Sequence, residues 1–233
     1  MAPPLYQTVI DSIIARIAAG DLLPGGMLPS ETQLALDTGV SQGTARKALM
    51  MLEQHGIVRR EQGRGTFVTA RTPEKSLFNF FRLRPKDGRV VSPVVASERI
   101  LQRPATEAER EVLQGAPEQV TEIRRIRSLL DVPSVLETSV VSSDLFPGLE
   151  RRSPLPSALY VLYQQAYGCI ILHAEESMAA VLSTPDVIEA LQLPGPTPLL
   201  QVDRLARDIL GRTVEIRHSL YRTDELRYAI KLD

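Results

Sequence analysis

The sequence has little that could staple a fold or hold a metal. It contains one cysteine, Cys169, which excludes an intrachain disulfide and a cysteine-rich zinc site. A lone cysteine usually behaves as a small apolar side chain, so we expect Cys169 to be buried. The three histidines, His55, His173 and His218, lack the spacing of metal ligands. We therefore expect no metal and no cofactor.

Long apolar runs and a strong net charge are also missing. No stretch approaches the length of about 18 apolar residues that a membrane-spanning helix needs. The first four residues lack the charged start and apolar core of a signal peptide. We therefore expect a cytoplasmic protein with no membrane partner. The formal net charge of -1 gives no global indication of nucleic-acid binding, so local charge has to carry any such argument.

The chain contains two differently patterned segments separated by a polar stretch. Residues 70–76 are polar and include a proline, which predicts a linker. Residues 77–89 mix three phenylalanines with basic side chains, and they suit either an apolar anchor strand of the second domain or a basic surface facing DNA phosphates. We predict two domains with a linker and entry segment between them: residues 1–69, 70–89 and 90–233.

The amino-terminal segment begins with an amphipathic pattern. Leu5, Val9, Ile13 and Ile17 recur at steps of four, which predicts a helix with one apolar face. Gly20 supplies a stop, because glycine accepts the left-handed conformation that follows many helices.

Two short helices separated by a tight turn are predicted next. Ser30, with Gln33 three residues later, forms a capping box that starts a helix over 31–38. Ser41 can cap a third helix. The intervening Thr38-Gly39-Val40 fits the short turn of a helix-turn-helix.

The third helix would be the recognition helix, whose amino-terminal residues reach base edges. Gln42 and Arg46 lie opposite its apolar face and suit adenine and guanine, or a phosphate. Thr44 offers a hydroxyl where backbone N–H groups favour a phosphate, and Gly43 leaves room for close approach. The alternative is that Gln42 and Arg46 belong to a solvated helix face without a partner.

A hairpin with a glycine-rich tip is predicted after the helices. Residues 57–60 and 66–69 are strand-like, and Gly63-Arg64-Gly65 lies between them. An arginine at a thin tip can enter a minor groove or contact a phosphate, whereas the alternative is a flexible surface side chain. The glycine spacing does not fit a nucleotide phosphate loop.

Three blocks in this order resemble the GntR family of bacterial regulators: Leu28-Pro29-Ser30-Glu31, Val40-Ser41-Gln42-Gly43-Thr44-Ala45-Arg46-Lys47-Ala48-Leu49, and Gly63-Arg64-Gly65-Thr66-Phe67-Val68. The resemblance implies a winged helix-turn-helix that binds a short palindromic operator in double-stranded DNA as a homodimer. The candidate DNA-binding residues are Ser30, Ser41, Gln42, Gly43, Thr44, Arg46, Lys47, Gly63, Arg64 and Gly65. Family members usually carry arginine where this chain has Thr32 and Gln42, and the segment is nearly neutral.

The second segment alternates strand-like and helix-like stretches, and mostly sequential strands predict an α+β domain with an antiparallel sheet. The expected strands are 94–101, 120–130, 134–142, 170–181, 199–209, 213–221 and 228–232, and the expected helices are 106–113, 157–167 and 185–193.

Polar residues inside these strands indicate a possible anion site. Arg125 and Arg127 alternate by two, so they share one face of a strand. Paired guanidinium groups suit a carboxylate or phosphate. Glu137, Glu215 and Tyr221 lie on strands that could be neighbours. The alternative is a solvated outer sheet face on which glutamates balance the arginines.

The second segment also resembles the UTRA effector domain of the HutC subfamily, on Arg125-Ile126-Arg127, Glu137, Leu145-Phe146-Pro147, Leu159-Tyr160, Tyr167-Gly168 and 215–221. The resemblance implies a chorismate-lyase-like fold that senses a small ligand. The candidate effector-binding residues are Arg125, Arg127, Glu137, Tyr160, Glu215 and Tyr221. Ala158 stands where the family often has serine, and the turn at 131–133 lacks the usual glycine.

These patterns predict a transcription regulator, a repressor whose operator binding is modulated by a small anionic effector. Two alternatives remain open. The second domain could only dimerise, which would leave a constitutive DNA-binding protein. It could also be a lyase-like enzyme, although no nucleophile–base constellation is visible and we expect no catalysis.

Overall fold

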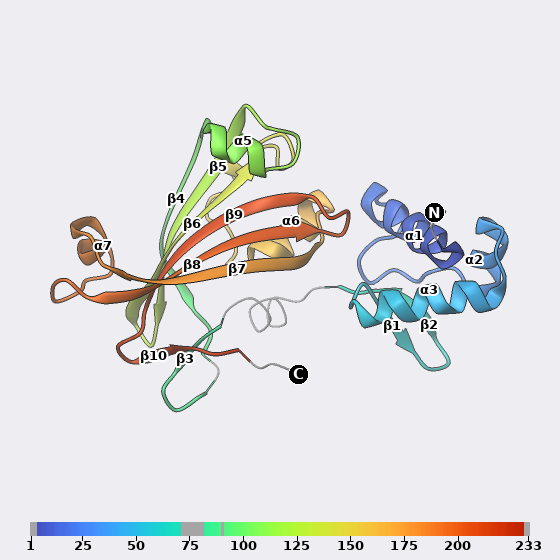
Figure 1. Cartoon of the computed structure of the whole chain (residues 1–233), viewed down its shortest axis with the longest axis horizontal. Coiled ribbons are helices and arrows are strands. Elements are labelled where there is room, and N and C mark those ends of the chain that lie inside the picture. The colour runs from blue at the N-terminus through green and yellow to red at the C-terminus, as the bar shows by residue number, and fades with distance from the viewer. Residues whose placement is uncertain (1–3, 71–81, 90, 231–233) are drawn as a thin grey trace. The chain divides into compact units, whose positions relative to one another are not determined.

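The computed structural model describes residues 4–70, 82–89 and 91–230. The chain divides into two compact units (Figure 1). The first comprises Met1–Thr72 and Tyr160–Leu172, and the second Pro73–Leu159 and His173–Asp233. Phenylalanines 78, 80 and 81 of the expected entry segment lie outside the described residues.

The first unit opens with three helices and a β-hairpin: α1 (Leu5–Ala19), α2 (Glu31–Thr38), α3 (Gln42–Gln54), β1 (Val58–Glu61) and β2 (Gly65–Val68). Val9, Ile13 and Ile17 are buried, as the spacing predicts. Leu5 was expected on the same face but is 65% exposed, and it is the first residue of α1. Leu34 and Leu49 complete the core from α2 and α3.

Side-chain caps begin the two helices of the helix-turn-helix. Ser30 Oγ accepts from the Gln33 N–H at 3.2 Å, and Ser41 Oγ accepts from the Thr44 N–H at 3.2 Å. The predicted capping box at Ser30 is only half formed, because the Gln33 side chain donates to Asp37 at 2.7 Å instead. Gly20 ends α1 in the left-handed conformation, with φ +86°, as predicted.

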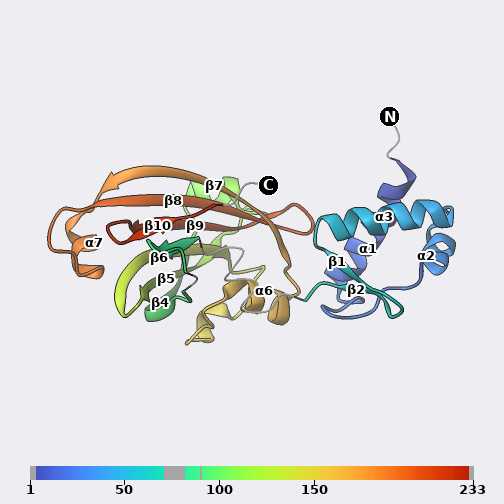
Figure 2. The ribbon, with the colours of Figure 1, turned by 90° about the horizontal axis from the view of Figure 1, so that it is seen from below.

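The second unit is built on a six-stranded antiparallel sheet in the order β4-β5-β6-β9-β8-β7, so β4 and β7 form its edges (Figures 1 and 2). Its strands are β4 (Val94–Pro104), β5 (Gln119–Leu129), β6 (Val132–Ser142), β7 (Ile171–Leu182), β8 (Pro198–Asp208) and β9 (Thr213–Arg222). The first residues of β7 are grouped with the first unit. The predicted α+β class with an antiparallel sheet is confirmed.

The turn between β5 and β6 lies one residue earlier than predicted. Leu130 and Asp131 both have positive φ, 52° and 62°, which is the backbone of a two-residue hairpin turn. Val132 and Pro133, which were expected in the turn, begin β6 instead. A one-residue bulge in the pairing after Arg127 accommodates the proline.

Short helices complete the fold: α5 (Glu107–Val112), η1 (Leu149–Arg151), α6 (Leu159–Tyr167) and α7 (Pro185–Ala190). The helices expected over 157–167 and 185–193 are therefore shorter than predicted. Ser157 has left the helix because its side chain and carbonyl bind an arginine on the sheet. In α7, Val187 packs with Leu191 and with Leu136 of β6, so the residues after Ala190 serve as a packed turn.

The last strand begins two residues earlier in the sequence than the predicted strand at 228–232. β10 (Leu226–Tyr228) pairs with β3 (Leu83–Pro85) in a separate two-stranded sheet. Leu83 and Leu226 pack with Tyr221 in one apolar cluster, which explains why the chain pairs here. Within the described residues no helix is long and apolar enough to cross a membrane.

Candidate functional site

The recognition helix α3 presents its candidate residues to solvent. Ala45, Ala48 and Leu49 are buried against the rest of the unit, whereas Gln42 and Arg46 are exposed. Gly43 and Lys47 are exposed on the same helix. A methyl group built on Gly43 would meet only the Ser41 Oγ, at 3.9 Å, so nothing within the described residues requires a glycine there.

The basic side chains of this surface have internal partners that are easily exchanged. Arg46 Nε donates to Glu31 Oε2 at 2.9 Å while the Arg46 side chain is 59% exposed. Lys47 Nζ lies 4.4 Å from the centre of the Tyr6 ring. An exposed ion pair contributes only about 0–1 kcal/mol, so a phosphate or a base edge could replace Glu31 at little cost.

The β1–β2 hairpin forms the wing. Arg64 at its tip is 73% exposed and pairs with Glu61. Gly63 and Gly65, on either side of it, have φ of +73° and +121°, backbone conformations that residues other than glycine rarely adopt. Arg59 stacks on Phe67 of the partner strand, 5.1 Å from its ring centre. The glycines therefore turn the chain so that Arg64 projects from the tip.

Ser30 and Ser41 are placed differently from the other candidates. Each hydroxyl caps a helix, and Ser41 Oγ also pairs with the Thr44 hydroxyl at 2.9 Å. Their local role is to begin α2 and α3, and Thr44 is half-buried beside Ser41. Helix capping therefore accounts for both serines without a DNA contact.

A row of polar residues crosses the six-stranded sheet on one face, which we call the inner face. Directly paired residues of antiparallel strands share a face. One row runs Glu98, Arg125, Glu137 and Ser219, and the next contains Ser139, Arg217 and Arg204. Arg125 and Arg127 are 1% and 3% exposed, so the alternative of a solvated outer face is wrong.

Arg127 is held at every nitrogen. Its Nε donates to Glu137 Oε1 at 2.8 Å, its Nη1 to Ser157 Oγ at 2.9 Å, and its Nη2 to the Ser157 carbonyl at 3.0 Å. Both side chains of the Arg127–Glu137 ion pair are 3% exposed. The pair ties neighbouring strands β5 and β6 to the segment that leads into α6.

Arg125 takes its partner from the opposite neighbour, the edge strand β4. Its Nε and Nη2 both donate to Glu98 Oε2, at 2.8 and 2.6 Å. The side chains of this pair are 0% and 8% exposed. The two arginines therefore share a face, as predicted, but they bind different carboxylates.

Further along the inner face, two more arginines are paired. Arg217 contacts Glu215 at 3.0 Å and Glu137 at 3.7 Å. Arg204 Nε donates to Glu176 at 2.7 Å, and Glu176 also accepts from the Tyr228 hydroxyl at 2.5 Å. Glu215 is fully buried. Burial and the Glu176 carboxylate raise the pKa of Tyr228.

The surrounding arginines determine the charge state of Glu137. Burial by itself would raise the pKa of this carboxyl, but Arg127 and Arg217, with a further contribution from Arg125, outweigh it and hold the pKa at about 2. Glu137 is therefore a carboxylate at neutral pH. Its negative charge lies between Arg127 and Arg217, and among the described ion pairs it is the one carboxylate that Arg127 has.

The aromatic candidates are both buried. Tyr221 is 4% exposed and lies against Tyr228 with ring centres 5.7 Å apart, and burial raises its pKa. Tyr160 is 3% exposed and packs on Tyr163 within α6, in the segment grouped with the first unit. The structure thus brings five of the six effector candidates together on the sheet unit and assigns Tyr160 to the other unit.

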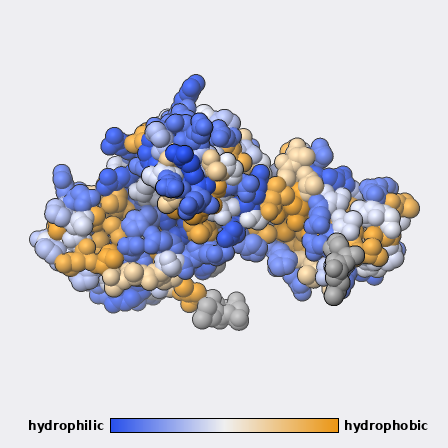
Figure 3. Space-filling view, turned by 45° about the horizontal axis from the view of Figure 1, so that its top comes forward, coloured by the Kyte–Doolittle hydropathy of each residue, from blue (hydrophilic) through white to orange (hydrophobic). Residues whose placement is uncertain are grey.

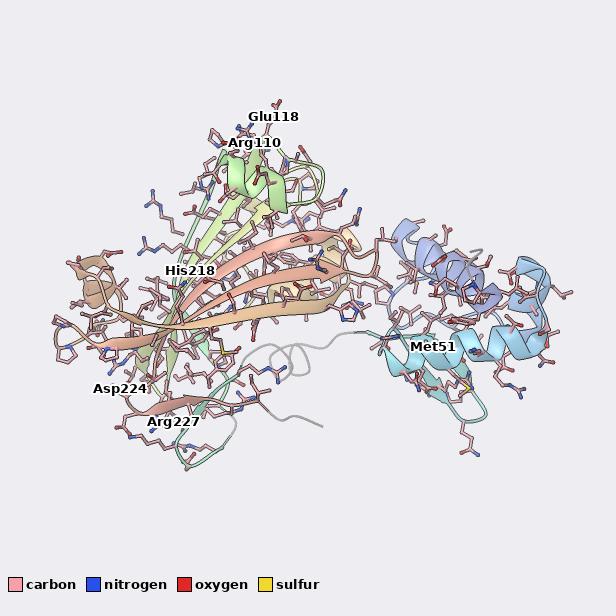
Figure 4. All side chains as sticks on the ribbon, in the orientation of Figure 1. Met51, Arg110, Glu118, His218, Asp224 and Arg227 are labelled. Carbon is pink, nitrogen blue, oxygen red and sulfur yellow. The ribbon has the colours of Figure 1, made fainter. Side chains whose placement is uncertain are left out.

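The opposite, outer face of the sheet carries a separate cavity of about 420 Å³. Arg124, next to Arg125 in sequence, lines it together with Thr138 and His218. His218, labelled in Figure 4, contacts Asp203 at 2.5 Å. Hydrophilic residues cover much of the surface seen in Figure 3, whereas the inner-face arginines are buried.

Four inner-face residues were not predicted: Glu98, Glu176, Arg204 and Arg217. Each lies in a stretch that was predicted to be a strand, so the sequence already indicated which neighbouring residues share its face of the strand. What was missing is the strand order, which brings Arg204 opposite Arg217. Within the described residues, no group of three His, Cys, Asp or Glu side chains could hold a metal ion.

The sequence matches two described families. Residues 5–68 match bacterial regulatory proteins of the gntR family, and residues 88–227 match the UTRA domain.

Relatives extend over almost the whole chain. The mannosyl-D-glycerate transport/metabolism system repressor MngR of Escherichia coli (strain K12) is 28% identical over 97% of this chain and 95% of its own. The HTH-type transcriptional repressor NagR of Bacillus subtilis (strain 168) is 26% identical over 99% of this chain and 95% of its own.

Solved structures are also similar to this chain. The ligand-binding domain of a putative GntR-family regulator from Bordetella bronchiseptica is 28% identical, with a TM-score of 0.57 over 66% of this chain and 97% of its own. PhnF from Mycobacterium smegmatis, at 22% identity, shares the fold with a TM-score of 0.56 over 96% of this chain and 99% of its own. This chain therefore belongs to the GntR family of bacterial regulatory proteins, with a UTRA domain following its helix-turn-helix.

Proposed function

We propose that this protein is a cytoplasmic transcriptional repressor that a small anionic metabolite releases from its operator. Residues 1–69 bind DNA, residues 70–89 link, and residues 90–233 hold the effector and form the homodimer. Two relatives over nearly the full length are named repressors, which supports the direction of control. The proposal of an anionic effector rests on the arginines of the buried inner face. Guanidinium groups placed out of solvent are a strong recognition element for an oxyanion.

The DNA contact follows from the exposed side of α3. Gln42 and Arg46 would meet base edges or phosphates in one half of a short palindromic operator, and Arg64 at the wing tip would enter the minor groove or contact a phosphate. Lys47 adds phosphate attraction. Two copies bind together when their spacing matches the half-sites, so a ligand that alters this spacing weakens binding.

Effector control is tested by a thermal-shift screen of the full chain against small phosphates, sugar phosphates and carboxylates. A ligand at 100 times its Kd stabilises by about 2.7 kcal/mol, which corresponds to roughly 5–10 °C for a domain of this size. The same ligand should release operator DNA in a fluorescence anisotropy titration, because the coupling between the two sites is reciprocal.

Two arginines of one strand provide the matched variants. Arg125→Lys keeps the charge but loses the fork, so it should abolish the ligand shift, whereas Arg124→Ala on the outer face should leave it intact. Operator binding that no ligand in the panel alters would favour a constitutive dimeric DNA-binding protein. Turnover of a ligand by the chain would favour the lyase-like enzyme.

The neutral charge of residues 1–69 predicts a shallow salt dependence. This segment holds six lysines and arginines against six aspartates and glutamates. Gln42→Arg should steepen the slope of log Kd against log salt by about 0.9, the value for one added phosphate contact on duplex DNA. Gln54→Arg adds the same charge at the other end of α3 and should change the slope less. Equal slopes for Gln42→Arg and the wild type would contradict the placement of Gln42 at the DNA.

A further inference from the structure

Glu98 on the edge strand β4 accepts four hydrogen bonds with one carboxylate. Its Oε2 accepts from Arg125 Nε and Nη2, at 2.8 and 2.6 Å. Its Oε1 accepts from Ser153 Oγ at 3.2 Å and from the Leu155 N–H at 3.0 Å. The side chain is 8% exposed. Glu98 therefore joins the sheet to the segment around Ser153–Leu155 with one oxygen and binds Arg125 with the other.

Arg125 keeps hydrogen-bonding capacity that Glu98 does not use. Its Nη1 is buried and has no hydrogen-bond partner among the described residues, and the same holds for Ser139 Oγ on the same face. Buried polar atoms are almost always bonded, and leaving one unpaired costs about 1–3 kcal/mol. This part of the inner face can thus donate more hydrogen bonds than the described chain accepts.

Arg127 differs from Arg125 in this respect. All three of its guanidinium nitrogens donate to Glu137 or Ser157. Glu137 also contacts Arg217, so its displacement would disturb the ion pairs of two arginines and leave Arg127 without a carboxylate among the described ion pairs. Glu98 faces one arginine only among the described ion pairs. Of the two carboxylates, Glu98 is therefore the one that an incoming anion can replace at lower cost.

We propose that Glu98 is a built-in substitute for the effector's anion. The carboxylate or phosphate of a small ligand takes over Arg125 Nε and Nη2, and its further oxygen atoms reach Nη1. Glu98 then leaves the arginine and releases Ser153 Oγ and the Leu155 N–H. This inference rests on the proposed function and identifies Glu98 as the residue that sets affinity and signals occupancy.

The released segment leads in sequence into α6, whose residues from Tyr160 onward group with the amino-terminal unit. Exchange of Glu98 for a ligand oxyanion thus changes the bonding of the stretch that connects the effector site to that group. A carboxylate on the chain also excludes weak anions, because a ligand must compete with an acceptor that is already tethered.

The test uses the full chain and inorganic phosphate as the probe. Glu98→Gln keeps an oxygen for Ser153 and Leu155 but no longer neutralises Arg125. We expect phosphate to bind this variant at least tenfold more tightly than the wild type, measured by thermal shift and isothermal titration. Adding Arg125→Lys to Glu98→Gln should remove the gain. Equal phosphate affinity of Glu98→Gln and the wild type would overturn the proposal.

Two controls separate this site from others. Glu176→Gln removes a carboxylate from Arg204 on the same face and should bring no comparable gain; an equal gain would mean that any lost inner-face carboxylate has this effect, and Glu98 would have no special role. Adding Arg124→Ala to Glu98→Gln should leave the gain intact, and its loss would place the phosphate in the outer cavity and overturn the proposal.

A second variant keeps the proposal testable if Glu98→Gln fails to fold. If Glu98→Gln does not fold, Glu98→Asp retains the charge on a side chain too short to hold both Arg125 and Leu155, so phosphate binding tighter than in the wild type is expected, with a smaller gain than for Glu98→Gln. The wild-type ligand screen stands apart from these measurements. Ligand-dependent operator release together with unchanged phosphate affinity in the Glu98 variants would remove this inference and leave the proposed function in place.

Discussion

Replacing Glu137 by alanine should destabilise the sheet unit by about 3–5 kcal/mol, the range observed when one partner of a buried ion pair is removed. Glu137 is 2% exposed and contacts Arg127 and Arg217. Among the described ion pairs, its removal leaves the buried Arg127 guanidinium without a counter-charge and takes one of two carboxylates from Arg217. Urea unfolding of the full chain, followed by far-UV circular dichroism, measures the loss, with the two units fitted as separate transitions.

A surface glutamate in the same unit provides the control. Glu225 pairs with Lys86 at 2.9 Å and its side chain is 79% exposed. Glu225→Ala should cost less than about 1 kcal/mol, because exposed ion pairs contribute little. Similar losses for Glu137→Ala and Glu225→Ala would contradict the buried network.

The same carboxylate should make stability depend on pH. Its pKa is about 2 in the folded protein against an ordinary value of 4.5. A lowered folded-state pKa stabilises above the unfolded pKa, so the contribution is fully present above about pH 4.5 and is lost as the pH falls toward 2, amounting to about 3 kcal/mol. Glu137→Gln should lack this part of the acid-induced loss when its free energy of unfolding is followed over that range.

Arg46→Ala should weaken operator binding about 10- to 100-fold while leaving the fold intact. A good base contact by arginine contributes about 1–3 kcal/mol of discrimination. Among the described residues, the Arg46 side chain pairs only with Glu31, in an exposed ion pair, so stability should change by less than about 1 kcal/mol. Fluorescence anisotropy on an operator selected from random DNA with the wild type measures the affinity.

The pattern of loss identifies what Arg46 touches. A base contact relaxes specificity at one position, whereas a phosphate contact lowers affinity on all sequences and reduces the salt slope by about 1. Arg16→Ala, in the last turn of α1, removes one positive charge outside the helix-turn-helix and should have a small effect. Operator affinity within twofold of the wild type for Arg46→Ala would rule out Arg46 as a DNA contact.

The amino-terminal unit was largely predictable, because its determinants are local. Ser41 and Thr44 are three residues apart, and their cap begins α3 at the predicted place. Gly20 ends α1 because the left-handed conformation is a property of that one residue. The error at Ser30 has a similarly local cause, since Asp37 one turn further along competes for the Gln33 amide.

The individual strands of the sheet were predictable from the sequence. Which face of the sheet is buried was not. Alternation determines that Arg125 and Arg127 share a side, but it does not say which side the rest of the chain covers. Burial of that side depends on elements from distant parts of the sequence, such as the packing of Leu83 and Leu226 with Tyr221.

By itself, the sequence determined the caps, the glycine stops, the strand alternation and the family, since each depends on neighbouring residues or on a linear motif. The tertiary structure alone decided which carboxylate neutralises which arginine. Glu98 meets Arg125 across 27 residues, and Glu176 meets Arg204 across 28, because the strand order and register bring them together. The physical reason is that an ion pair between strands depends on a distance in space, and chain separation leaves that distance undetermined until the sheet is assembled.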